Sequence, residues 1–149
     1  MTCQQTFDNF ILTKRLADLS GKTISNYEQF IAPFIDFLGT DRDFERVTQE
    51  DIVAYIRANY KDPSLCLNKL SDEFGISESY FSHMFKENMN INFSVYLEDL
   101  RLNEAARLIK EGNSNLTEVS FEVGYNNPTS FRRAFKKKFG VTPSAMAAQ

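Results

Sequence analysis

The feature that most constrains the fold of this chain is an internal repeat in its C-terminal two-thirds. Residues 67–75 read LNKLSDEFG and residues 116–124 read LTEVSFEVG, with leucine, an aliphatic residue, serine, glutamate and glycine in register. After one extra residue in the second copy, FSHMFK at 81–86 corresponds to FRRAFK at 131–136. A repeat of this kind indicates that the chain builds one small supersecondary unit twice.

Each copy has the pattern of a short helix, a glycine-containing turn and a second helix, which is how a helix-turn-helix is built. Gly75 and Gly124 are expected to supply the turn conformation, which a Cβ atom disfavours. Ser71 and Ser120 are small enough to let two crossing helices approach closely. The phenylalanines spaced four residues apart in each second helix are expected to point inward: Phe81, Phe85, Phe131 and Phe135.

The rest of the chain also has helical periodicity, because its apolar residues recur every three or four positions and rarely alternate. Further helices are expected at about 6–19, 23–38, 49–60 and 92–111. Thr48 followed by Asp51 predicts the start of the third of these, and Pro33 should kink the second.

The sequence therefore predicts an all-α fold. In it, an N-terminal helical pair is joined through a shared helix at 49–60 to two helix-turn-helix subdomains that a long helix links. The expected domains are residues 1–47 and residues 48–149. Within the second domain we place the helix-turn-helix units at about 65–89 and 115–140, on either side of the linker helix.

Composition excludes several classes of protein. The 149 residues leave little room for a large cofactor-binding enzyme fold, and no apolar run approaches the roughly 20 residues of a membrane span. Cys3, Cys66 and the single histidine, His83, are too few and too dispersed for a zinc site. We expect a cytoplasmic protein that is not an enzyme, with no metal, cofactor or membrane partner.

Charge is distributed unevenly along the chain. The net charge is −3, yet residues 125–149 hold five basic side chains and no acidic one. The inward phenylalanines leave the opposite face of each second helix to solvent. In the second copy, Arg132 and Arg133 are candidates to read bases, since arginine can donate two hydrogen bonds to guanine. Lysines near the helix ends suit phosphates: Lys86, Lys136 and Lys137.

A family resemblance is carried by three strings: LNKLSDEFGISESYFSHMFKE, YLEDLRLNEAARLI and VGYNNPTSFRRAFKKKFGVTPS. Through them, residues from about 48 to 146 are similar to the DNA-binding domain of AraC/XylS-type transcription regulators. The resemblance implies two recognition helices in successive major grooves of double-stranded DNA, about 34 Å apart. It also implies RNA polymerase as a further partner. It assigns base-reading positions to Ser79, Ser82, His83, Thr129, Arg132 and Arg133. The chain departs from the family at His83, where arginine is frequent, and in its AMAAQ ending.

The N-terminal part resembles a different family. The resemblance is carried by the strings FILTKRLADLSGKTISNYEQFIAPFIDFLG and, after it, VTQEDIVAYI. They are similar to the helical core-binding, SAM-like domain of tyrosine recombinases. The catalytic domain of those recombinases has no room here. A natural fusion and an engineered chimera would both have such a sequence.

The predicted function is sequence-specific binding of double-stranded DNA in transcription regulation. The alternatives are an interaction or scaffold module and an accessory DNA-clamping fragment of a recombination system. The oligomeric state is left open.

Overall fold

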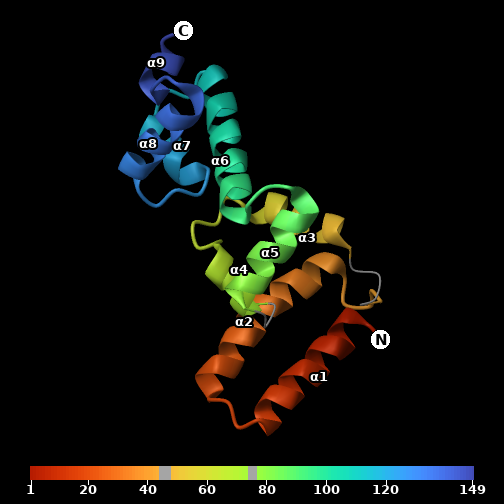
Figure 1. Ribbon diagram of the computed structural model, residues 1–149. Coiled ribbons are helices and arrows are strands. Elements are labelled where there is room, and N and C mark those ends of the chain that lie inside the picture. The colour runs from red at the N-terminus through yellow and green to blue at the C-terminus, as the bar shows by residue number, and fades with distance from the viewer. Residues whose placement is uncertain (44–47, 74–76) are drawn as a thin grey trace.

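The computed structural model describes residues 1–43, 48–73 and 77–149, and its regular elements there are α-helices (Figure 1). An isolated antiparallel bridge joins Thr2 to Asp43. The helices are α1 (Cys3–Leu16), α2 (Gly21–Leu38), α3 (Gln49–Asn59), α4 (Leu67–Glu73), α5 (Glu78–Met89), α6 (Phe93–Lys110), α7 (Leu116–Glu122), α8 (Pro128–Phe139) and α9 (Pro143–Ala147). The predicted all-α class is confirmed. In the described ranges, no helix combines the length and the apolar character that crossing a membrane requires.

Helix α1 begins and ends about three residues earlier than the helix expected at 6–19. α1 begins at Cys3 because Thr2 caps it: the Thr2 hydroxyl accepts from Gln5 N, and the Gln5 side chain accepts from Thr2 N. It ends at Leu16, and Asp18 has a left-handed backbone with φ 56°. Leu16, the last residue of α1, is 80% exposed.

The helices bury three apolar cores. One lies between α1 and α2 and is made of Cys3, Phe7, Ile11, Ile24 and Ile35. A second is made of Phe34, Tyr55, Ile56, Leu65, Leu70, Phe81, Phe85, Phe93 and Leu97. The third contains Leu102, Ala105, Ala106, Ile109, Val119, Val123, Phe131 and Phe135. The helix α2, which contains Pro33, contributes to the first two cores, and α6 contributes to the last two.

The two copies of the repeat form two similar helix pairs, α4 with α5 (the first unit) and α7 with α8 (the second unit). All four predicted inward phenylalanines are buried. Ser71 and Ser120 are buried too, and their hydroxyls donate to the carbonyl oxygens of Asn68 and Thr117 at 2.9 and 2.7 Å. The left-handed turn glycine is confirmed at Gly124, with φ 95°, whereas Gly75 lies outside the described residues.

The long helix α6 runs from the first unit, which lies at its N-terminal end, to the second unit, which lies beside its C-terminal half (Figure 1). Its predicted span of 92–111 agrees with the observed Phe93–Lys110. The last helix, α9, was not predicted. Thr142 caps it by accepting from Ala145 N at 3.1 Å, and the buried Pro143 stands in its first turn, where a missing N–H costs nothing.

Candidate nucleic-acid interface

The exposed face of α5 is defined by its buried one. Ser77 caps the helix by accepting from Tyr80 N at 3.1 Å, and Phe81 and Phe85 then point into the second core. The residues on the other side are the predicted Ser79, Ser82, His83 and Lys86; all are exposed except Ser82, which is half-buried. The structure therefore gathers the predicted residues of the first unit on one solvent-facing side of α5.

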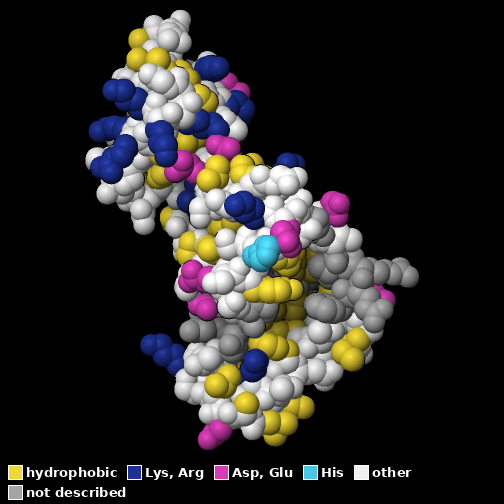
Figure 2. Space-filling model, viewed as in Figure 1, with side chains coloured by type: hydrophobic (Ala, Val, Ile, Leu, Met, Phe, Trp, Pro, Cys, Tyr) yellow, Lys and Arg dark blue, Asp and Glu magenta, His cyan; other side chains and the backbone are white. Residues whose placement is uncertain are grey.

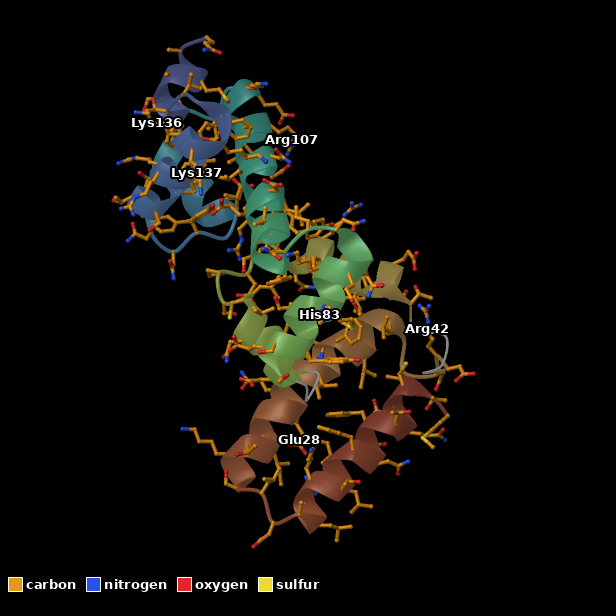
Figure 3. The ribbon with its side chains drawn as sticks, viewed as in Figure 1. Glu28, Arg42, His83, Arg107, Lys136 and Lys137 are labelled. Atoms are coloured by element: carbon orange, nitrogen blue, oxygen red, sulfur yellow. The ribbon has the colours of Figure 1, made fainter. Side chains whose placement is uncertain are left out.

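An acidic residue stands on this same side of α5. The His83 side chain is 71% exposed, and its Nδ1 lies 3.6 Å from Glu87 Oε1, one helical turn further on. Figure 3 labels His83 on α5, and Figure 2 shows the histidine side chain on the surface of the molecule. Glu87 was not among the predicted site residues, although its spacing of four from His83 was visible in the sequence. The face of α5 is thus close to neutral, with one lysine and one carboxylate.

The helix α8 is built in the same way but carries a different charge. Asn127 caps it by accepting from the backbone N–H groups of Thr129 at 2.8 Å and Ser130 at 3.3 Å, and Pro128 occupies its first turn. With Phe131 and Phe135 fully buried, the exposed residues include Thr129, Arg132, Arg133, Lys136 and Lys137. All five predicted residues of the second unit lie on the solvent side of α8.

The four cations of this face have no partner among the described residues. The side chains of Arg132, Arg133, Lys136 and Lys137 take part in no hydrogen bond or ion pair there. Lys138 differs, because it donates to the carboxylate of Asp99 on α6. Figure 2 shows Lys and Arg side chains gathered over the upper lobe, and Figure 3 labels Lys136 and Lys137 there on α8. The result is a concentrated positive surface without internal neutralisation.

A structural role for the lysines is also present. Lys136, Lys137 and Lys138 lie in the last turn of α8, where positive charge interacts favourably with the carbonyl end of the helix dipole. This effect accounts for some of the basic character at the helix end. It does not account for Arg132 and Arg133, which stand nearer the middle of the helix.

The two exposed faces correspond residue by residue. A register of 50 pairs the capping residues Ser77 and Asn127 and the buried Phe81 and Phe131. The same register pairs Ser79 with Thr129, Ser82 with Arg132, His83 with Arg133, and Lys86 with Lys136. The second unit therefore presents arginines at two positions, where the first presents Ser82 and His83, and the other two pairs are alike.

Comparison with known families agrees with both halves of this architecture. Residues 70–149 match the helix-turn-helix domain family, and residues 6–91 match the phage integrase N-terminal SAM-like domain. The two matches overlap over residues 70–91, which include α5. The segment that carries the first unit is thus shared by the two resemblances.

Individual proteins are also similar in sequence to this chain. The transposon Tn10 TetD protein of Escherichia coli is 30% identical over 104 residues, which are 70% of this chain and 75% of TetD. The chain covers between 5% and 37% of three other, longer relatives.

Solved structures also match. The C-terminal domain of the two-component response regulator yesN from Fusobacterium nucleatum is 31% identical, with a TM-score of 0.64, over 66% of this chain and 96% of that one. An AraC-type transcriptional regulator from Chromobacterium violaceum is 25% identical, with a TM-score of 0.55, over 65% and 86%. With the repeated helix pairs, the linker helix and the helix-turn-helix match, the chain belongs to the AraC-type family of helix-turn-helix transcription regulators.

Proposed function

We propose that this protein binds double-stranded DNA sequence-specifically, with α5 and α8 in successive major grooves, and thereby regulates transcription. The observation that carries the proposal is the unpartnered cationic face of α8, held outward by two fully buried phenylalanines. Four cations without internal partners repel one another, and a bound polyanion would relieve this repulsion. RNA polymerase as a second partner and a cytoplasmic location belong to the same proposal.

The residues of the two helices take different parts. Arg132 and Arg133 read base edges, while Lys136 and Lys137, nearer the helix end, contact phosphates. Thr129 adds a short polar contact at the start of α8. In the first unit, Ser79, Ser82 and His83 supply neutral contacts to bases, and Lys86 contacts a phosphate. The second unit therefore supplies most of the affinity, and the first adds discrimination.

The N-terminal helices form part of the same body in this proposal. The two proposed domains, residues 1–47 and 48–149, differ in the family that each resembles. Because Phe34 of α2 packs in the core of the first unit, α1 and α2 act as a support for that unit. A separate clamping of DNA by the N-terminal helices is not needed to explain their place.

The test is selection of bound sites from random duplex DNA, followed by affinity measurements on one selected and one scrambled duplex at several salt concentrations. Displacing counterions from Z phosphates gives a log–log slope of about −0.9Z, so we expect a slope of several units. Selection of a defined motif supports the proposal. No enrichment, or no binding at low salt, would favour the interaction-module alternative.

A matched pair of double variants separates the proposed surface from general charge. Changing Arg132 and Arg133 to alanine should reduce the preference for the selected duplex and relax it at the bases that α8 reads. Changing Lys22 and Lys110 to alanine removes the same charge from exposed positions on α2 and α6 and should leave the preference intact. Equal effects of the two double variants would overturn the assignment to α8.

A further inference from the structure

The junction between the two units is organised around one side chain of the linker helix. Arg101, near the middle of α6, extends to the loop between α3 and α4. Its Nε donates to the carbonyl oxygen of Tyr60, and its Nη2 donates to that of Asp62, both at 2.8 Å. Two backbone acceptors of the loop are thus held by one planar guanidinium, whose fixed fork suits such paired contacts.

The same loop touches the second unit on its other side. A Cβ atom added at Gly124, in the turn of that unit, would lie 2.6 Å from the Tyr60 carbonyl oxygen and 2.8 Å from Arg101 Nε. Lys61 Nζ lies 3.6 Å from Glu122 Oε1 on α7. The guanidinium carbon of Arg101 is 6.0 Å from the centre of the Tyr125 ring. The loop is therefore in contact with α6 and with the second unit at once.

The loop is also fastened to the first unit. The Asp62 carboxylate accepts from Ser64 N at 2.8 Å, from Ser64 Oγ at 2.6 Å and from Lys69 Nζ at 3.1 Å. Lys69 belongs to α4, the first helix of the first unit. A continuous chain of contacts thus runs from α4 through the loop and Arg101 to the turn of the second unit.

We infer that Arg101 is a positioning residue that fixes the orientation of the second unit relative to the first. This inference rests on the proposed function and deepens it. If two recognition helices are to enter two grooves together, their mutual orientation decides which separation of half-sites fits. Linked binding gains affinity only when the geometry allows both contacts at the same time. Arg101 therefore sets the spacing of the DNA site without contacting DNA.

The first experiment measures orientation without DNA. Spin labels are attached to cysteines introduced at the exposed Asp72 of α4 and Glu118 of α7, with Cys66→Ser to remove the other exposed thiol. Pulsed EPR should give a narrow distance distribution for this labelled parent. Arg101→Met should broaden or displace it. Identical distributions in the parent and the variant would overturn the inference.

Two further variants test whether a change in the distance distribution arises from the junction between the units. Gly124→Ala leaves Arg101 in place but forces a Cβ against the Tyr60 carbonyl at a residue with φ 95°, so it should displace the second unit as well. Arg107→Met is the control on the same helix, because the Arg107 guanidinium bonds only to Glu104 and Glu111 of the α6 end among the contacts described. It should leave the distribution unchanged; a change as large as that of Arg101→Met would contradict the assignment.

The second experiment uses the selected duplex with base pairs inserted or removed between its half-sites. The parent should lose about tenfold or more in affinity when the spacing is changed, whereas Arg101→Met should lose less than about threefold. Affinity for an isolated second half-site should be the same for both. If the parent binds no DNA, the proposed function fails, and the EPR distances still decide whether Arg101 orients the units. If the variant keeps the parent's spacing preference, the inference fails and the proposed function stands.

Discussion

Arg42 binds the carboxylate of Asp51 with both terminal nitrogens of its guanidinium, each 2.8 Å from one carboxylate oxygen. The same carboxylate accepts from Thr48 N at 2.7 Å and so closes the first turn of α3. Asp51 therefore fastens the segment after α2 to the start of α3. The hydrogen bonds from the Thr48 backbone and hydroxyl, and after them the nearby Arg42, lower the pKa of Asp51 below its ordinary value of 3.8.

Asp51→Asn should destabilise the protein at neutral pH by about 1–2 kcal/mol, the usual cost of losing an interaction that caps a helix. Because the pKa of Asp51 is lowered by folding, its ionised form stabilises the folded state at every pH above its unfolded pKa. The contribution is lost as the pH falls through the lowered value. Denaturant unfolding at pH 7 and at progressively acidic pH should show the two proteins converging in acid. A constant difference at all pH values would contradict this role.

The buried rings of α5 and α8 should carry much of the stability of their units. Phe85→Ala and Phe135→Ala should each cost about 3–5 kcal/mol, because each removes a ring from a small core that collapses poorly around the gap. Phe121→Ala is the control, since this ring is 51% exposed, and it should cost less than about 1 kcal/mol. Chemical denaturation followed by circular dichroism measures all three. Similar losses for the three variants would mean that the inward faces are wrongly assigned.

Base contacts and phosphate contacts on α8 should be separable. Arg132→Ala or Arg133→Ala should cost about 1–3 kcal/mol on a selected site and relax the preference at one base position. Lys137→Ala should weaken binding to all duplexes alike and reduce the salt slope by about one unit. Titrations of a selected and a scrambled duplex give both quantities. Equal losses on the two duplexes for every variant would show an electrostatic surface that reads no sequence.

Glu87 should weaken binding by the first unit, because its carboxylate stands beside His83 on the face that meets DNA. Glu87→Gln should raise affinity for any duplex by about two- to fivefold at low salt, with a smaller gain at high salt, where screening is stronger. Asp8→Asn on α1 changes the net charge equally and is the control. An equal gain from Asp8→Asn would show that only net charge matters.

The sequence predicted those features that depend on spacing along one helix. The inward positions Phe81 and Phe131, the small residues Ser71 and Ser120, and the extent of α6 all follow from periodicity and repetition, and the structure confirms them. The exposed faces of α5 and α8 follow from the same reasoning. Their roles in reading DNA stay predictions.

Contacts between distant segments were not predictable in this way. Arg101 lies in a helical pattern that says nothing about a loop some forty residues earlier, so its hydrogen bonds to Tyr60 and Asp62 gave no signal. The boundaries of α1 were displaced because the capping pair Thr2 and Gln5 precedes the first apolar residue of the periodic pattern. Glu87 follows His83 by four residues, so its place on the same side of α5 is predictable from the sequence.

Phe34 and Ile35 are consecutive in α2, yet they belong to different cores. Phe34 packs edge-on against Tyr55, with ring centres 5.1 Å apart, in the core of the first unit, while Ile35 packs with α1. Neither core can open without exposing a side of the same helix, so the two should unfold as one cooperative unit. Native-state hydrogen exchange should therefore give a common opening free energy for amides of α2 and α5.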